Sequence, residues 1–289
     1  MKDILTSLRP RQWVKNLFVF LPLIFGKKIF AFPEDVEVLF AFLIFSATSS
    51  AVYLVNDVSD LKEDRAHKKK RLRPIAAGKV SVRTALTLAV LLGGLSLVSA
   101  FLLNPLLGWL EISYILLNLA YSRFLKHKVL IDVGCIAIFF LLRVAAGSVV
   151  AGVEMSHWIL FMTALLALFL GFNKRRQELH LQKGGGTERR VLANYDGYFI
   201  DQMVSVVTAS IVVVYMLYTV DAQTVANLGT EHLSYTVPFV YYGIFRYLFL
   251  VHKANVDGDP TTALLSDRQM LLNIGLWIAT CVSVIYFGL

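Results

Sequence analysis

The chain has 289 residues, of which 57% are hydrophobic and only 17% are charged, and its mean hydropathy is +0.64. A soluble domain carries about 25% charged residues, so this composition excludes an ordinary soluble protein and predicts an integral membrane protein. Two isolated cysteines, Cys135 and Cys281, exclude a disulfide framework and a Cys-rich metal site. No polar block is large enough to fold separately, so we expect one integral membrane domain over residues 1–289.

Nine apolar stretches have lengths near those needed to cross about 30 Å of hydrocarbon. In chain order they cover residues 17–32, 36–55, 82–103, 106–124, 129–151, 155–172, 200–220, 233–251 and 270–289. The first stretch is short and contains Pro22, which predicts a tilted or kinked helix. We therefore predict an all-α, polytopic bundle of nine transmembrane helices.

Basic residues are concentrated on one side of this predicted bundle. With nine spans, 24 of the 28 Lys and Arg residues fall on the face that carries the N-terminus. The positive-inside rule makes that face cytoplasmic, so we expect a protein of the cell inner (plasma) membrane with a cytoplasmic N-terminus and active site. Topology and attraction to anionic lipid headgroups also account for the net charge of +8. The sequence has no nucleic-acid recognition motif, which excludes that partner.

An acidic motif follows the second predicted span. It reads N-D-x-x-D-x-x-x-D and comprises Asn56, Asp57, Asp60 and Asp64. On a continuous helix at 100° per residue, all four side chains lie within one arc of about 100°. Carboxylates clustered in this way repel one another unless cations compensate them. A solvated acidic helix end is the plain alternative, but four residues on one arc favour a functional site.

The chemistry of these ligands points to magnesium. Hard oxygen ligands without Cys or His suit Mg²⁺, which takes few carboxylates and completes its shell with water and substrate phosphate. A strongly basic segment follows directly at residues 65–73, and it includes Arg71 and Arg73. Cations beside metal-binding acids suit a polyanionic substrate, so a metal-bridged diphosphate is the expected occupant.

At these residues the chain resembles the UbiA-type intramembrane prenyltransferase superfamily, whose first aspartate-rich motif has this form and is followed by a basic R-P stretch. Tyr121-Ser122 with Lys126 after the fourth span, and Asp132 leading into the fifth, extend the resemblance. The superfamily's bundle of nine helices agrees with the number of spans that we derive from hydropathy.

The loop expected after the sixth span departs from the common superfamily pattern. Many members have a second aspartate-rich motif there, whereas this chain has Lys174, Arg175, Arg176 and Glu178. This K-R-x-x-E-L run, followed by R-x-V-L-x-x-Y ending at Tyr195, resembles the decaprenyl-phosphate phosphoribosyltransferase branch. So do the R-P-R-Q-W-V-K-N run at residues 9–16, F-L-L-R at 140–143 with Gly147, and G-D-P-T at 258–261.

That resemblance implies transfer of a 5-phosphoribosyl group from phosphoribosyl diphosphate to a polyprenyl (decaprenyl-type) phosphate, with Mg²⁺ as cofactor. Asp57, Asp60 and Asp64 are the catalytic candidates, and Asn56, Asp60 and Asp64 are the metal ligands. The phosphate-clamp candidates are Arg71, Arg73, Lys126, Lys174 and Arg175. The complete set of substrate-binding candidates is Lys15, Asn56, Arg71, Arg73, Tyr121, Lys126, Arg143, Lys174, Arg175, Glu178 and Tyr195.

Several of these residues have two possible roles. Glu178 is either the salt-bridge partner of Lys174 and Arg175 or a contact to ribose or metal. Tyr195 either donates to a phosphate oxygen or anchors the chain at the membrane interface. Asp132 and Arg143 are eleven residues apart and share a helix face, where they either neutralise each other through a third group or form the floor of a polar cavity.

Two other functions remain open from the sequence. The acidic motif alone also fits a prenyltransferase that moves a prenyl group from a prenyl diphosphate to an aromatic or haem-like acceptor. A non-enzymatic lipid or anion transporter would use the same cations as a path, but the sequence shows neither an inverted repeat nor paired broken helices. The glycine run at residues 184–186 is either a phosphate lid or a plain loop.

Overall fold

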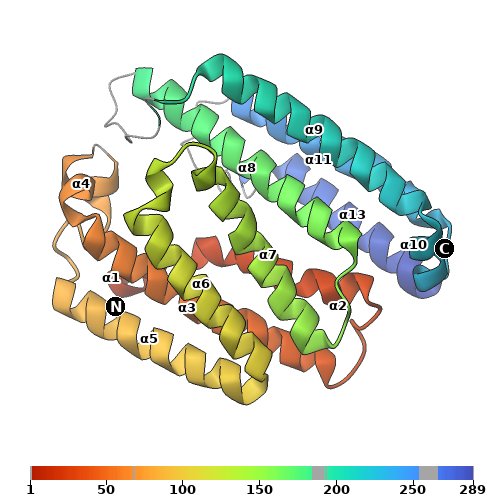
Figure 1. Cartoon of the computed structure of the whole chain (residues 1–289), viewed down its shortest axis with the longest axis horizontal. Helices are drawn as coiled ribbons and strands as arrows, with labels where there is room; N and C mark the ends of the chain where they lie inside the picture. Colours follow the sequence, from red (N-terminus) through yellow and green to blue (C-terminus); the bar gives the residue numbers. More distant parts are fainter. Residues whose placement is uncertain (1, 68, 184–191, 193, 254–265, 289) are drawn as a thin grey trace.

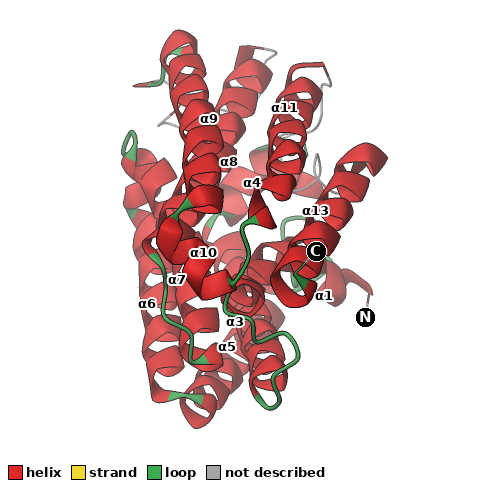
Figure 2. Cartoon of the chain, turned by 90° about the vertical axis from the view of Figure 1, so that its right-hand side faces the viewer, coloured by secondary structure: helices red, strands yellow, loops and turns green. Residues whose placement is uncertain are grey.

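The chain forms a bundle of long antiparallel helices in a computed structural model that describes residues 2–67, 69–183, 192, 194–253 and 266–288 (Figure 1). All regular elements within those ranges are helices (Figure 2). They are α1 (Lys2–Ser7), η1 (Pro10–Phe20), α2 (Leu21–Phe25), α3 (Glu34–Ser59), α4 (Leu61–Ala66), η2 (Lys70–Leu72), α5 (Val82–Leu103), α6 (Pro105–Arg123), η3 (Leu125–His127), α7 (Ile131–Ala151), α8 (His157–Lys183), α9 (Gly197–Val220), α10 (Ala222–Leu228), η5 (His232–Thr236), α11 (Val237–Lys253) and α13 (Arg268–Phe287). The predicted all-α class is therefore confirmed.

Most predicted spans coincide with a long helix. The stretch predicted at 82–103 is α5 itself, and those predicted at 36–55, 106–124, 129–151, 200–220 and 270–289 agree with α3, α6, α7, α9 and α13 to within a few residues. Six helices, namely α3, α5, α7, α8, α9 and α13, are long and apolar enough to cross a membrane among the described residues. The chain is thus a multi-span membrane protein.

The first predicted span has a different structure. Residues 10–20 form the 3₁₀ helix η1, and α2 ends only five residues later at Phe25. Pro10 and Pro22 remove backbone donors, which disfavours one long α-helix. The segment packs tightly against α7, because a Cβ atom at Gly147 would lie 1.9 Å from the carbonyl oxygen of Val19. Glycine is therefore required at this crossing.

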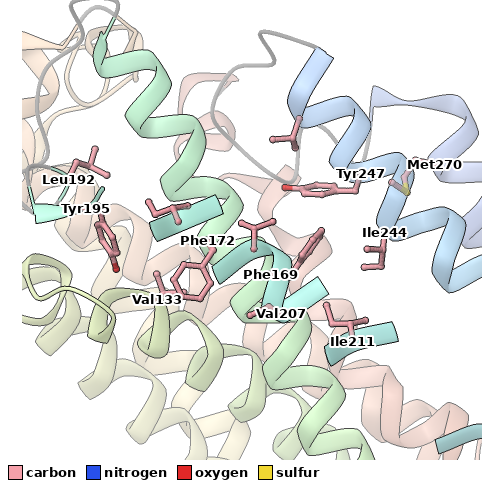
Figure 3. Packing of buried hydrophobic residues seen from close by; sticks show 13 residues of the cluster. Val133, Phe169, Phe172, Leu192, Tyr195, Val207, Ile211, Ile244, Tyr247 and Met270 are labelled. Carbon is pink, nitrogen blue, oxygen red and sulfur yellow. The ribbon is translucent and has the colours of Figure 1, made fainter. Parts of the chain in front are cut away.

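The two largest apolar clusters of the described residues both include residues of α7. One joins η1, α2, α3, α6 and α7, with a small contribution from α5. The other joins α7, α8, α9, α11 and Met270 of α13 around Phe169, Phe172 and Tyr247 (Figure 3). The outer face of α5 instead exposes apolar side chains such as Val90, Leu95 and Leu102, as expected for a surface in contact with lipid.

Candidate active site

The acidic motif lies where α3 ends and α4 begins, at the end of the bundle that also carries the C-terminal end of α8 (Figure 1). The motif does not lie on one continuous helix, so the angles expected for such a helix do not hold beyond Asp60, whose φ and ψ are −90° and 12°. Ser59 and Asp60 are weak helix formers whose side chains compete for backbone hydrogen bonds. The amides of Asp60 and Asp64 still donate to the carbonyls of Asn56 and Asp60, at 2.9 and 2.8 Å, so the motif stays compact.

Each carboxylate of the motif contacts a basic side chain. Arg9 pairs with Asp57, and Lys126 Nζ lies 3.0 Å from Asp60 Oδ1. Arg73 Nη1 lies between two acids, 3.1 Å from Asp57 Oδ1 and 2.6 Å from Asp64 Oδ2. We call these residues the motif cluster, which comprises Arg9, Asp57, Asp60, Asp64, Arg73 and Lys126.

The loop that carries Arg73 is fixed to the bundle. Ile75 and Ala76 are buried, and Arg65 Nε donates to the carbonyl of Ala76 at 3.2 Å. The Ala77 amide also donates to the carbonyl of Arg73 at 2.8 Å. The backbone at Arg73 is therefore well anchored, whereas its side chain is 30% exposed. Arg71, in the same loop, is exposed.

The donor set of the motif cluster fits a magnesium ion. Asp57 and Asp64 already share one cationic nitrogen, so a single cation can contact both carboxylates. Mg²⁺ is commonly bound by one or two carboxylates together with substrate phosphates. Within the described ranges no three His, Cys, Asp or Glu side chains are grouped as a ready metal cage. Asn56, a predicted metal ligand, has a protein partner in this structure, because its Oδ1 accepts a hydrogen bond from the hydroxyl of Ser122 at 2.7 Å.

A second group of charges lies on α8, and it is helical. We expected Lys174, Arg175 and Glu178 in a loop after residue 172, but α8 continues to Lys183. We predicted a loop because the sequence becomes polar after the apolar span. A transmembrane helix can, however, continue beyond the hydrocarbon core of the membrane, as α8 does. Lys174 is half-buried on this last part of α8.

Arg175 is the centre of a buried network. Its side chain has no exposed surface, and its Nε lies 2.6 Å from Asp132 Oδ2. It also pairs with Glu178, and its Nη2 donates to the hydroxyl of Tyr121 at 3.3 Å. Tyr195 donates to Asp132 Oδ1 at 2.7 Å and accepts from the amide of Leu130 at 2.8 Å. We call Tyr121, Asp132, Arg175, Glu178 and Tyr195 the Arg175 cluster.

The Arg175 cluster changes the interpretation of three sequence candidates. The guanidinium of Arg175 is committed to protein partners rather than placed as an open phosphate clamp. Glu178 is the salt-bridge partner of Arg175, as one of the two alternatives expected. Tyr195 bonds to Asp132 instead of facing the membrane interface, and burial raises the pKa of its hydroxyl, so that it stays protonated.

The two clusters are adjacent, because neighbouring residues of α6 reach each of them. Tyr121 contacts Arg175, whereas Ser122 donates to Asn56 of the acidic motif. Lys126 follows in η3 and contacts Asp60. The end of α6 therefore couples the acidic motif to the charged end of α8.

A third polar group lies within the bundle around Arg143, which is 3% exposed. Its Nε donates to Asn16 Oδ1 at 2.7 Å, its Nη2 to the hydroxyl of Tyr114 at 2.9 Å, and its Nη1 to the carbonyl of Phe139 at 2.7 Å. These three acceptors are neutral. Arg143 and Asp132 thus have separate partners, and mutual neutralisation is not what this structure shows.

The sequence interpretation missed two charged residues near these groups. Arg9 neutralises Asp57, and no local pattern could pair residues 48 positions apart. Glu111 is fully buried on α6 within electrostatic reach of Arg143. A lone carboxylate within an apolar span is itself a signal, so this residue could have been found.

Lys15 is half-buried on η1 beside the buried Asn16. The glycine run at 184–186 and the G-D-P-T run at 258–261 lie outside the described residues.

Both the sequence and the fold are similar to those of known proteins. The model of the UbiA prenyltransferase family matches residues 19–265. Decaprenyl-phosphate phosphoribosyltransferase of Mycobacterium tuberculosis is 35% identical over 290 residues, which are 99% of this chain and 95% of that protein. The protein of the same name from Corynebacterium glutamicum is 35% identical over 289 residues, 98% of this chain and 86% of that protein. A UbiA homolog from Archaeoglobus fulgidus bound to DMAPP and Mg²⁺ has the same fold, with a TM-score of 0.73 at 19% identity over 98% of this chain and 99% of that chain.

Proposed function

Because this chain belongs to the UbiA prenyltransferase family, and its full-length relatives are named decaprenyl-phosphate phosphoribosyltransferase, we propose that it transfers 5-phosphoribosyl from phosphoribosyl diphosphate to a polyprenyl phosphate. The bond between C1 of the ribose and the diphosphate oxygen breaks, and a bond from C1 to the acceptor phosphate oxygen forms. Diphosphate is the leaving group. The observation that carries this proposal is that the acidic motif contacts the basic side chains of Arg9, Arg73 and Lys126 and lies beside the charged end of α8, since both substrates are strongly anionic.

The motif cluster is the proposed site for the diphosphate of the donor. Asp57, Asp60 and Asp64 would hold Mg²⁺, which supplies positive charge to the leaving diphosphate when it is bound. Arg9, Arg73 and Lys126 already surround these carboxylates and can bond to diphosphate oxygens. Arg71 and Lys174 complete the proposed set of phosphate contacts.

The acceptor needs positioning more than activation. Its phosphate is already ionised at neutral pH, so no strong general base is required at the site. Arg143 is the proposed contact for an anion deeper in the bundle, because its buried charge is hydrogen-bonded to neutral groups. In-line displacement then predicts inversion at C1, and a product with retained anomeric configuration would contradict it.

We further propose nine spans in the cell inner membrane, with the active site on the cytoplasmic side. The concentration of 24 of 28 basic residues on one face supports this orientation. The product is a lipid-linked pentose phosphate, a step toward pentose donors for cell-wall glycans such as arabinogalactan.

A donor comparison tests the proposed function against the prenyltransferase alternative. Purified protein in detergent with Mg²⁺ is given labelled phosphoribosyl diphosphate and polyprenyl phosphate, or labelled prenyl diphosphate and an aromatic acceptor. We expect label to enter the lipid phase only from phosphoribosyl diphosphate, and to be lost in Asp60→Asn and Lys174→Ala. Activity with only the prenyl diphosphate would establish the alternative.

A further inference from the structure

The positive and negative charges of the motif cluster are equal in number. Three carboxylates, those of Asp57, Asp60 and Asp64, contact three basic side chains, those of Arg9, Arg73 and Lys126. The formal charge of the cluster is therefore zero without a metal ion or substrate. An electrically neutral cluster attracts an incoming divalent cation far less than three free carboxylates would.

Arg73 occupies the place in this cluster where a cation bridges two acids. Its Nη1 is within 3.1 Å of Asp57 and 2.6 Å of Asp64, and the two carboxylates are only 4% and 2% exposed. A metal ion that bound these same oxygens would have to displace this nitrogen. Arg73 and a metal ion are thus alternative partners of Asp57 and Asp64.

The arrangement allows Arg73 to leave without disturbing the fold. Its side chain is 30% exposed, whereas its loop is fixed by buried Ile75 and by the bond from Arg65 to the carbonyl of Ala76. Arg9, at 25%, is likewise more exposed than its partner Asp57, at 4%, whereas Lys126, at 13%, is less exposed than its partner Asp60, at 34%. Arg73 and Arg9 can therefore rotate toward an arriving anion while Asp57 and Asp64 stay in place.

We infer that Arg73 is an internal counter-cation, which gives up Asp57 and Asp64 only when a divalent metal ion arrives together with a diphosphate. The diphosphate provides new negative partners for the displaced Arg73, so the exchange leaves no basic group unpaired. A metal ion alone provides none. The inference rests on the proposed function for the identity of the donor, but it concerns only the diphosphate part of that donor.

Metal-binding measurements with inorganic diphosphate test this inference without turnover. Mn²⁺ replaces Mg²⁺ as a spectroscopic probe, and its free concentration is followed by electron paramagnetic resonance. For the wild-type protein we expect diphosphate to tighten Mn²⁺ binding at least tenfold. For Arg73→Gln we expect Mn²⁺ alone to bind about tenfold more tightly than to wild type, with a smaller further gain from diphosphate.

Two control variants separate the specific contact from general charge. Lys79→Gln removes one positive charge from the same segment, where Lys79 contacts Asp3 at 3.9 Å, and should leave Mn²⁺ affinity unchanged. Arg73→Lys keeps a cation and should behave more like wild type than Arg73→Gln does. Equal effects of Arg73→Gln and Lys79→Gln would overturn the inference.

The wild-type protein alone also provides a decisive result. Binding of Mn²⁺ with the same affinity in the presence and absence of diphosphate would overturn the inference even if Arg73→Gln failed to fold. A failure of the proposed function gives a different result from a failure of the inference about Arg73. If only the proposed function were wrong, diphosphate would still tighten Mn²⁺ binding, but labelled phosphoribosyl diphosphate would not be consumed.

Discussion

The motif cluster and the Arg175 cluster are built from the same types of charged side chain, but they differ in burial. Arg175 and Asp132 have no exposed surface, whereas Arg73 is 30% exposed and Asp60 is 34% exposed. The hydrogen bonds of Arg175 run to three elements of the bundle, namely α6, α7 and its own helix α8. Arg73 instead reaches its acids from a loop. The comparison indicates that a fully buried ion pair fixes helices in place, while a partly exposed ion pair can exchange partners with a substrate.

Removal of the charge of Arg175 should have the largest effect on stability. Arg175→Met leaves the carboxylate of Asp132 buried without its cation, and breaking a buried pair in this way costs about 3–5 kcal/mol. The free energy of unfolding in mild detergent, measured by denaturant titration, checks this expectation. A variant as stable as wild type would show that the Arg175 cluster does not fix the helices.

Lys126→Met should affect catalysis rather than folding. The change removes the cation 3.0 Å from Asp60 and with it one proposed contact to diphosphate, so we expect kcat/KM to fall about 10- to 100-fold. Steady-state kinetics with varied donor measures the effect. Lys128→Met is the matched control, since Lys128 is exposed and lies two residues away. An equal loss in both variants would argue against a specific role for Lys126.

Tyr195→Phe should have an intermediate effect on stability. The variant keeps the ring but leaves Asp132 Oδ1 and the amide of Leu130 without this partner, at a cost of about 1–3 kcal/mol. Thermal unfolding in detergent measures the loss. If Tyr195 contacted a phosphate instead, the KM for a substrate would rise while the unfolding temperature stayed constant.

Arg176→Ala should have the smallest effect, although Arg176 is the next residue after Arg175. It pairs with Asp201, which is 54% exposed, and such surface pairs contribute about 0–1 kcal/mol. The same unfolding titration that is used for Arg175→Met therefore gives a direct contrast on one helix. If Arg176→Ala lowered the free energy of unfolding as much as Arg175→Met does, buried and exposed ion pairs would not differ in their contribution to stability.

Hydropathy was sufficient to predict the positions of most long helices of this fold. The predicted range 82–103 matches α5 because Ser81 caps its start and Asn104 ends it, and both signals are local. Hydropathy failed for the span predicted at 17–32, where prolines and close packing against Gly147 favour the 3₁₀ helix η1 followed by the short α2. It also ended α8 too early, because polar residues past the hydrocarbon carry no apolar signal.

The sequence singled out most residues of the motif cluster, but not Arg9 and not the pairings. The spacing of Asn56, Asp57, Asp60 and Asp64 predicted the acidic motif. In the structure, the candidates Arg73 and Lys126 contact this motif. The pairing of Arg9 with Asp57 depends on the path of η1 along α3, which no local pattern specifies. The burial of Arg175 likewise depends on α6, α7 and Tyr195 converging, so one sequence could not distinguish a clamp from a buried support.

The most direct test compares two carboxylate-to-amide variants, Asp64→Asn in the motif cluster and Asp132→Asn in the Arg175 cluster. Transfer of label from phosphoribosyl diphosphate to polyprenyl phosphate is measured for both, together with thermal unfolding. We predict that Asp64→Asn loses about 100- to 1,000-fold in transfer with little change in unfolding temperature, whereas Asp132→Asn unfolds at a clearly lower temperature. Normal transfer by Asp64→Asn, or no transfer by the wild-type protein, would contradict this account.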